Sequence, residues 1–563
     1  MKTGTVKFYE EDKGFGFIKM DDSDKEIYFN KNGLIDYVEE TDIVSFDEIQ
    51  TKRGLGAINI KVIIQEIEKL NEDYKNEQIQ NGDLSIDPLS KKVIKSIREN
   101  WKLEAKLESQ KNYFYHLKEV NSILDGSKYY IIGRKGSGKS SISEYIFNLG
   151  NFDKFSEKLS FKNFPFNELY SLDNQKYTPP NQYITLWKYL MYSTVAKLMV
   201  QNEKIDATIR SKLGEIYAHE PIRSLARTIN NWTSAEFGTH ILGTGGTLKY
   251  SRDVSPQISN WIERVDALED IILKYCDDSK YFIVFDELDE DYRDLKSDDH
   301  VFYNYLLTSL FKAVQDVKYT FLSTRIKIFP IVFLRDDIYS LIKDADKNKW
   351  RDFKIEIEWS TEMIKRLLAY RLSVDAESEK VLNFHNAWKM IFLNENIKSG
   401  SGRTTLSTFD YINRSTHLRP RDYIRYLQAC AEATTTSERI TNVTVKYVDR
   451  AFSNYLRDEI IDEIFPLLPE IEIIFQIISN LRKWSFSAYE FRAEYNKYLK
   501  SKTITEENVD YVLDTLYKFS VLGNQDKKRI DTLYFKYSHT NINLNKSEKL
   551  VVHRGLFKAL QIF

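Results

Sequence analysis

The feature that most constrains this chain is a glycine-rich turn inside residues 129–147, YYIIGRKGSGKSSISEYIF. An apolar run precedes the turn and an amphipathic segment follows it, which predicts a strand, a loop and a helix. The turn matches G-x-x-x-x-G-K-[ST] with Gly133, Gly138, Lys139 and Ser140. Backbone N–H groups that such a turn directs inward at a helix N-terminus form a cradle for phosphate. The stretch therefore predicts a phosphate-binding loop.

Two residues of this loop have individual roles in the predicted nucleotide binding. Lys139 is expected to reach the β- and γ-phosphates of a nucleoside triphosphate, and the Ser140 hydroxyl to ligate Mg²⁺. ATP and Mg²⁺ are therefore the expected cofactors. The alternative is a chance glycine-rich turn capped by serine. The residues predicted to bind the nucleotide are Gly133, Arg134, Lys135, Gly136, Ser137, Gly138, Lys139, Ser140 and Ser141.

A second anchor is residues 281–292, YFIVFDELDEDY. Its consecutive apolar residues predict a strand that is buried on both faces of a parallel sheet. Asp286 and Glu287 follow at the carboxyl edge, where open α/β sheets bind ligands. We expect Asp286 to belong to the Mg²⁺ shell and Glu287 to orient or deprotonate the attacking water. The alternative is an acidic loop after a core strand.

Length, charge and cysteine content limit the remaining possibilities. The 563 residues exceed what one hydrophobic core supports, so two to four domains are expected. The net charge is −2, from 81 basic and 83 acidic residues, so contacts with nucleic acid must come from local patches. The two cysteines, Cys276 and Cys430, have no metal-ligand spacing. Because the sequence also shows no signal peptide or membrane-spanning run, we expect a cytoplasmic protein without membrane contact.

Residues 1–63 contain short strand-like segments separated by acidic or glycine-containing breaks, which predicts a small all-β barrel. Alternation places four aromatic side chains on one face, where unpaired bases stack at about 1–3 kcal/mol each. Two lysines are expected beside the phosphates. The residues predicted to bind nucleic acid are Lys7, Phe8, Lys13, Phe15, Phe17 and Tyr28.

The barrel motifs KGFGFI at 13–18 and IYFN at 27–30 resemble those of the cold-shock domain, an OB-type barrel that binds single strands. The resemblance implies single-stranded RNA or DNA as a partner. Phe8 stands where the family usually has Trp, Glu10 replaces the usual Asn, and Asn30 replaces the usual His. These departures and the acidic surroundings predict weaker affinity than in free-standing relatives. The alternative is a barrel kept as a protein-interaction module.

Four segments are expected after the barrel. Residues 64–118 are predicted to be a helical linker, and 119–375 alternate strands with helices as a doubly wound P-loop core does. Residues 376–460 are predicted to form a helical lid, and 461–563 resemble a winged helix. The expected fold class is multidomain: a small all-β OB-type barrel, an α/β P-loop NTPase core with a helical lid, and a winged-helix-like α+β C-terminal domain.

The third helix of the expected winged helix, TEENVDYVLDTLYKFSVLG, is acidic and apolar rather than basic. A helix that reads a DNA major groove needs basic side chains, so we expect packing or a protein partner here. Lys527, Lys528 and Arg529 in the wing are a basic feature of this region.

Five segments together resemble bacterial P-loop ATPases of the STAND/AAA+ kind, including KAP-like members, across residues 110–563: GRKGSGKSS, VFDELDEDY, VFLRDDIY, IEWSTEMIKRLLAYRL and LRPRDYIRY. The resemblance implies ATP hydrolysis and a role in phage defence or stress signalling. It also implies arginines near the γ-phosphate, and Arg335 and the lid residue Arg421 are the candidates. The alternatives are an ion pair of Arg335 with Asp336 or Asp337, and one of Arg421 with Asp422 or a neighbouring helix.

Two functions are compatible with these features. The first is an ATP-driven switch or remodeller whose barrel senses single strands while the core changes its oligomeric state or its partner. A homo-oligomer is expected under this function. The alternative is a slowly hydrolysing, nucleotide-dependent scaffold whose barrel and winged helix bind proteins. Nuclease activity is disfavoured, because the sequence has no carboxylate cluster outside the predicted Mg²⁺ site.

Overall fold

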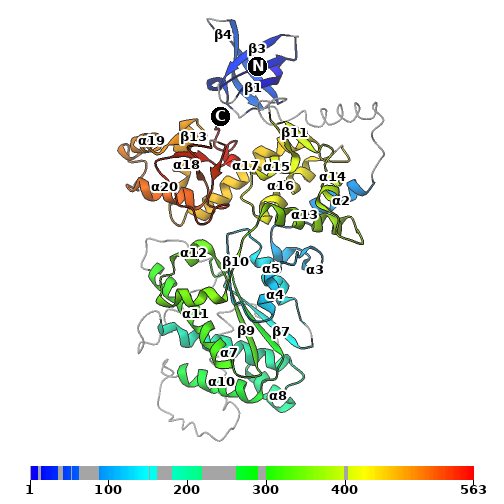
Figure 1. Cartoon of the computed structure of the whole chain (residues 1–563), viewed down its shortest axis with the longest axis vertical. Helices are drawn as coiled ribbons and strands as arrows, with labels where there is room; N and C mark the ends of the chain where they lie inside the picture. The colour runs from blue at the N-terminus through cyan, green and yellow to red at the C-terminus, as the bar shows by residue number, and fades with distance from the viewer. Residues whose placement is uncertain are drawn as a thin grey trace. The chain divides into compact units, whose positions relative to one another are not determined.

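The computed structural model describes residues 2–10, 14–23, 25–35, 38, 42–51, 54–62, 88–150, 152–161, 181–217, 261–289, 299–398, 404–435, 437–529 and 531–562. The chain divides into two compact units (Figure 1). The core unit is Glu104–Glu358, and the split unit combines Met1–Leu103 with Trp359–Phe563. The core unit is thus inserted into the sequence of the split unit.

The N-terminal segment is a closed five-stranded barrel, as the sequence predicts. Alternate residues along its strands are buried, and Val6, Ile18, Phe29, Val44 and Ile60 are among those that fill the interior. The strand order around the barrel is β1-β2-β3-β5-β4. The strands are β1 (Lys2–Glu10), β2 (Phe15–Met20), β3 (Glu26–Asn30), β4 (Ile43–Thr51) and β5 (Gly54–Val62).

The core unit contains a five-stranded parallel sheet in the order β10-β6-β9-β8-β7. The central strands are almost fully buried, which explains their uninterrupted apolar sequences. The predicted parallel α/β architecture is confirmed. The strands are β6 (Tyr130–Gly133), β7 (Lys154–Ser160), β8 (Lys280–Asp286), β9 (Lys327–Arg335) and β10 (Lys354–Ile357).

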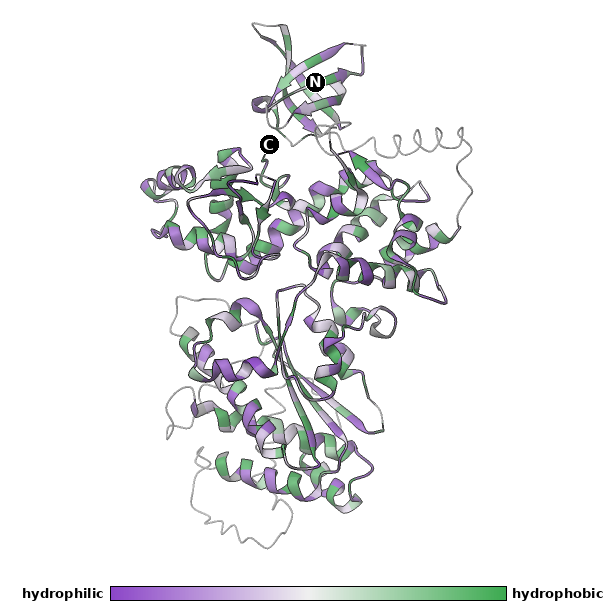
Figure 2. Ribbon diagram, in the orientation of Figure 1, coloured by the Kyte–Doolittle hydropathy of each residue, from purple (hydrophilic) through white to green (hydrophobic). Residues whose placement is uncertain are grey.

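Helices α4 and α5 lie on one side of these strands in Figure 1, and α11 and α12 lie on the other. Figure 2 shows hydrophobic and hydrophilic stretches alternating along the surrounding helices, as amphipathic packing on a core requires. The helices are η2 (Ala105–Leu107), α3 (Gln110–Tyr113), α4 (Glu119–Leu124), α5 (Lys139–Phe147), η3 (Asn181–Tyr183), α7 (Ile184–Gln201), α8 (Ala207–Ile216), α10 (Trp261–Tyr275), α11 (Asp299–Phe321), α12 (Asp336–Leu341) and η4 (Ala345–Phe353).

The helical part of the split unit combines a segment before the core unit with segments after it. Asp375 accepts hydrogen bonds from Ser96 at 2.6 Å and from the Trp101 indole at 2.8 Å. The elements are α2 (Pro88–Asn100), α13 (Thr361–Asp375), α14 (Phe384–Ile391), β11 (Asn396–Lys398), β12 (Thr405–Ser407), α15 (Thr408–Asn413), α16 (Pro420–Ala433) and α17 (Asn442–Ile464).

This arrangement differs from the expected segment boundaries. Helix α2 falls inside the expected linker 64–118, yet its residues Val93 and Ile97 are buried in the split unit. Helix α13 falls at the end of the expected core 119–375, yet it packs with α2 and α14. Local periodicity identifies both helices, but it does not say which core their apolar faces join.

The C-terminal segment has the winged-helix order of helices and strands. Its sheet has the strand order β13-β16-β14-β15. The last strand expected from the sequence is the one after the wing, so β16 is an additional strand. The elements are α18 (Ile471–Leu481), β13 (Ser485–Ser487), α19 (Ala488–Lys500), α20 (Val509–Lys518), β14 (Leu522–Gln525), β15 (Leu533–Tyr534), β16 (Lys549–Val552) and η5 (Arg554–Leu556).

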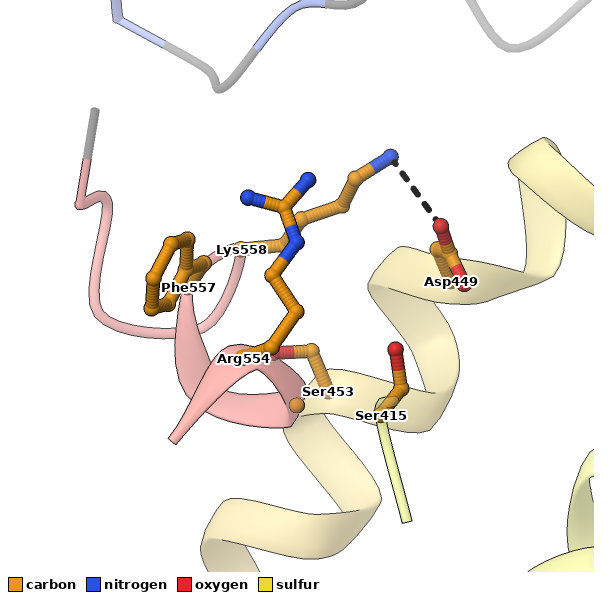
Figure 3. A pocket seen from close by; sticks show the side chains of 7 residues that line it. Ser415, Asp449, Ser453, Arg554, Phe557 and Lys558 are labelled. Atoms are coloured by element: carbon orange, nitrogen blue, oxygen red, sulfur yellow. Dashed lines mark ion pairs between the residues drawn. The ribbon is translucent and has the colours of Figure 1, made fainter. Parts of the chain in front are cut away.

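The end of the chain packs against helix α17. Figure 3 shows Lys558 extending toward Asp449, and the ammonium nitrogen lies 4.0 Å from a carboxylate oxygen. The amide of Ala559 donates to the Ser453 hydroxyl at 2.9 Å. Within the described ranges, no helix has the length and apolarity needed to span a membrane.

Candidate nucleotide site and aromatic surface

The glycine-rich turn connects the carboxyl end of β6 to the start of α5. Gly136 and Gly138 have φ angles of 77° and 95°, a left-handed backbone that glycine adopts without strain. Helix α5 begins at Lys139 directly after Gly138. The first N–H groups of a helix have no intrahelical acceptor, so this helix start provides donors for an anion at the turn.

The Lys139 side chain crosses this turn. Its ammonium donates to the carbonyl oxygens of Gly133 at 2.8 Å and Arg134 at 3.0 Å. Burial lowers the pKa of Lys139, while the carboxylates of Asp289 and Asp336 oppose this shift. A cation held over a turn at a helix N-terminus fits the binding of phosphate oxygens.

The other predicted nucleotide contacts surround Lys139. The Ser140 side chain is exposed, whereas Arg134, Lys135 and Ser141 are half-buried. Ser137 is buried, and a Cβ atom on Gly133 would lie 2.7 Å from its hydroxyl oxygen. A larger residue at position 133 would therefore displace the loop.

Asp286 and Glu287 lie at the carboxyl end of β8. The Asp286 side chain is only 6% exposed. Its Oδ1 accepts the Glu287 N–H at 3.0 Å, and its Oδ2 lies 2.8 Å from the ammonium of Lys158. Glu287 has a φ of 60°, a conformation that is unfavourable for residues other than glycine. Such strain is commonly found at functional sites.

Both carboxylate oxygens of Glu287 have partners. The Lys106 ammonium of η2 lies 2.7 Å from Oε1, and the Ser160 hydroxyl at the end of β7 donates to Oε2. These contacts fix where the predicted general base points.

Arg335 ends β9 and lies in register with Gly133 on the adjacent strand β6. Its guanidinium forms a two-point contact with Asp337, with Nε–Oδ1 at 3.0 Å and Nη2–Oδ2 at 2.7 Å. Asp289 lies 3.8 Å from Nη1. The ion pair with Asp337 that we considered is present, at a position beside the phosphate-binding turn.

Arg421, the predicted lid arginine, belongs to the split unit. Its Nη1 lies 3.4 Å from Glu459 of α17, and 21% of its side chain is exposed. The neighbouring Arg419 is buried and pairs with Asp422 at 2.9 Å and Glu463 at 2.8 Å. Arg421 thus has the neighbouring-helix partner that we considered, and its contact with a phosphate stays a prediction.

Sequence reasoning missed four residues of this site: Lys106, Glu144, Lys158 and Ser160. Lys158 and Ser160 alternate at the carboxyl end of β7, so a period of two along that strand would have placed both on one face. Glu144 and Lys106 carry no such signal, since their relevance comes from contacts with Lys158 and Glu287.

The residues present fit Mg²⁺ that arrives with a nucleotide. Mg²⁺ is usually held by one or two protein oxygens together with phosphates and water. The Ser140 hydroxyl and the Asp286 carboxylate provide such oxygens on α5 and β8. In the described part of the chain, no group of three or more His, Cys, Asp or Glu side chains is arranged to hold a metal by itself.

On the barrel, the structure brings the four predicted aromatic residues together. Phe8 lies 5.9 Å from Phe15 and 5.5 Å from Phe17, measured between ring centroids. Tyr28 lies 6.2 Å from Phe15 and 5.7 Å from Phe17. The three Phe rings are half-buried, and the Tyr28 side chain is 40% exposed. We call these four residues the aromatic surface.

The polar residues near the aromatic surface are mixed in charge. Lys7 is exposed and forms an ion pair with Glu26. Lys13 lies outside the described residues. Asn30 is exposed, and its side chain accepts the Asn32 N–H at 3.0 Å. The Lys7 ion pair reduces the positive charge that this side of the barrel offers a phosphate backbone.

Solved structures with some likeness to the chain include Drosophila ORC bound to DNA, at 11% identity and a TM-score of 0.28. That comparison covers 87% of this chain and all of the other. The crystal structure of Cdc6p from Pyrobaculum aerophilum has 10% identity and a TM-score of 0.26, and that comparison covers 78% of this chain and 89% of the other. TM-scores this low do not establish a shared fold.

Two family models match the chain. One, described as the FunZ-associated C-terminal helical domain, matches residues 362–461. The other is the 'Cold-shock' DNA-binding domain, and it matches residues 2–63.

Among curated proteins, Cold shock protein 1 of Lactiplantibacillus plantarum is 40% identical over 63 residues, which is 11% of this chain and 96% of that protein. Cold shock protein 2 of the same organism is 39% identical over 64 residues, which is 11% of this chain and 97% of that protein. Cold shock-like protein CspA of Shewanella violacea is 34% identical over 62 residues, which is 10% of this chain and 89% of that protein. Through residues 2–63, the chain therefore belongs to the cold-shock domain family.

Proposed function

We propose that this chain is an ATPase whose cold-shock barrel binds single-stranded nucleic acid. The observation that carries the ATPase proposal is the convergence of three features at the carboxyl ends of neighbouring strands. They are the phosphate-binding turn after β6, the pair Asp286 and Glu287 after β8, and Arg335 at the end of β9. Open α/β sheets bind ligands at this edge.

Each residue has a role in the proposed reaction. Lys139 and the N-terminus of α5 bind the β- and γ-phosphates, and Ser140 with Asp286 holds Mg²⁺, which neutralises charge on the phosphate oxygens. Glu287 accepts a proton from, or orients, the attacking water. Arg335 is the proposed sensor of the γ-phosphate, and it would exchange part of its contact with Asp337 for a phosphate oxygen.

The test is ATP turnover by the full-length protein and two variants. Lys139→Ala is expected to abolish nucleotide binding or turnover, because it removes the phosphate-binding cation. Glu287→Gln is expected to bind ATP and leave it unhydrolysed. Turnover at the wild-type rate in both variants would show that the activity arises elsewhere.

The nucleic-acid half of the proposal is supported by the aromatic surface and by the cold-shock family of residues 2–63. Bases stack on such rings with little sequence preference, so single-stranded RNA and DNA are both candidate ligands. ATPase rates with and without an oligonucleotide show whether this ligand affects the core. An ATPase rate that is the same with and without the oligonucleotide would favour a barrel that is attached to the core without controlling it.

A second candidate function is a slowly hydrolysing scaffold that binds protein partners. The feature that favours it is α20, where Asp510 and Asp514 both contact Lys546 and where Asp510 also contacts Arg492. Acidic side chains on this helix disfavour a DNA groove.

The ATPase proposal has four further parts. They are membership of the STAND or KAP-like ATPases, homo-oligomer formation, a cytoplasmic location, and a role in phage defence or stress signalling.

A further inference from the structure

Lys158, to which the proposed reaction gives no role, lies in a buried triad with Asp286 and Glu144. Its ammonium is 2.8 Å from Oδ2 of Asp286 and 2.8 Å from Oε1 of Glu144. The side chains of Lys158, Asp286 and Glu144 are 8%, 6% and 11% exposed. The three residues come from β7, β8 and α5, so the triad joins two strands to the helix that follows the phosphate-binding turn.

The triad fixes the orientation of Asp286. A carboxylate with one partner can rotate about its Cβ–Cγ bond, but here the Glu287 N–H occupies Oδ1 while Lys158 occupies Oδ2. Glu144 extends this connection to α5, whose second residue is Ser140. The two oxygens predicted to meet one cation, on Asp286 and Ser140, are therefore linked through Lys158.

The charges within the triad favour an additional cation. Two carboxylates against one ammonium leave one negative charge without a partner inside the triad. A buried charge is costly when it is uncompensated. A divalent cation beside Asp286 supplies the missing positive charge.

We propose that Lys158 is a positioning residue for the divalent cation, which it serves by orienting Asp286 and tying it to α5. This inference rests on the proposed nucleotide site. Removing groups that orient the ligands of a metal typically lowers metal affinity by about 10- to 100-fold.

The test measures Mn²⁺ affinity by electron paramagnetic resonance, using the full-length protein with a non-hydrolysable ATP analogue. Lys158→Met is expected to weaken Mn²⁺ binding by about 10- to 100-fold. Affinity for the analogue in EDTA is expected to stay close to that of the wild type, because Lys158 pairs with Asp286 and Glu144, neither of which is a predicted phosphate-binding residue.

The matched control is Lys197→Met. Lys197 on α7 is also buried and pairs at 2.7 Å with Glu157, the residue beside Lys158 on β7. The control removes an ion pair of the same kind from the same strand and should leave Mn²⁺ affinity unchanged. Equal losses in both variants would assign Lys158 a structural role and overturn the inference.

The double variant Lys158→Met with Glu144→Gln keeps the net charge of the triad while removing its connections. It decides the question if the single variant does not fold. In the double variant, Mn²⁺ binding is expected to be about 10- to 100-fold weaker than in the wild type, as in the single variant. Wild-type affinity there would mean that Lys158 acts only through charge balance. Wild-type protein that does not bind the analogue would instead overturn the proposed nucleotide site.

Discussion

Arg419 and Arg421 are two residues apart but lie in different environments. The Arg419 side chain is 2% exposed and pairs with Asp422 and Glu463, whereas that of Arg421 is 21% exposed. Breaking a buried ion pair typically costs about 3–5 kcal/mol, while a solvent-exposed pair contributes about 0–1 kcal/mol, and the half-buried Arg421 pair is expected to lie between these limits. Arg419→Ala should therefore lower the free energy of unfolding by several times more than Arg421→Ala, as urea titrations of both variants would show.

The same pair of variants tests the lid prediction. If Arg421 contacts the γ-phosphate, Arg421→Ala should reduce ATP turnover while unfolding close to the wild-type urea concentration. Full turnover in that variant would mean that Arg421 does not act on the γ-phosphate and would support a structural role such as its contact with Glu459.

His553 provides a prediction about pH. Burial lowers its pKa from 6.5 to about 3, and the nearby Arg419 guanidinium acts in the same direction. Between those pH values the unfolded chain binds a proton that the folded chain does not, so stability is full above pH 6.5 and falls as the pH drops. The loss from pH 8 to pH 5 should be about 2 kcal/mol.

Urea unfolding of the split unit at both pH values measures this loss. His553→Gln should flatten the dependence, because the variant has no imidazole to protonate in the unfolded chain. The same slope in wild type and variant would attribute the acid sensitivity to other groups.

At the scale of elements, strand β2 carries Phe15 and Phe17, which contribute half of the aromatic surface. Replacing both with alanine should weaken single-strand binding by more than about tenfold, since each stacked base contributes about 1–3 kcal/mol. Leu55→Ala is the control, because Leu55 is an exposed apolar residue on β5 outside the aromatic surface. Fluorescence anisotropy with a labelled oligonucleotide, at low and high salt, measures the effect. Unchanged affinity in the double variant would favour the protein-interaction function of the barrel.

Elements with a strong local pattern were predicted well from the sequence. The five barrel strands and strands β8 and β9 follow from alternation or from unbroken apolar runs, and the turn before Lys139 follows from its glycines. The partners of Glu287 did not follow, because Lys106 and Ser160 are 181 and 127 positions away. The membership of α2 in the split unit also required the fold, since its partner Asp375 is 279 positions from Ser96.

At the scale of the whole molecule, the proposed function requires that nucleic acid and ATP influence each other's binding. Reciprocity demands that a single strand change ATP affinity by the factor by which ATP changes strand affinity, commonly about 5- to 150-fold. Oligonucleotide affinity should therefore differ between the protein with ADP, with a non-hydrolysable ATP analogue and without nucleotide. Identical affinities in the three states would mean that the barrel is tethered to the ATPase without controlling it.

The insertion of the core unit between α2 and α13 also determines the order in which the protein can fold during synthesis. Helix α2 ends at Asn100, and its partner α16 ends at Ala433, so 433 − 100 = 333 residues are added after α2 before α16 is complete. At about 5–20 residues per second, the ribosome needs roughly 17–67 s to cover that interval. Helices α13 and α14, which also pack with α2, are made within this interval, so the burial of Val93, Ile97 and Trp101 is completed in steps and only after the core unit has been made. The core unit can complete its sheet first, so a released chain truncated after residue 358 should carry a folded core and the unpacked amphipathic helix α2, available to chaperones.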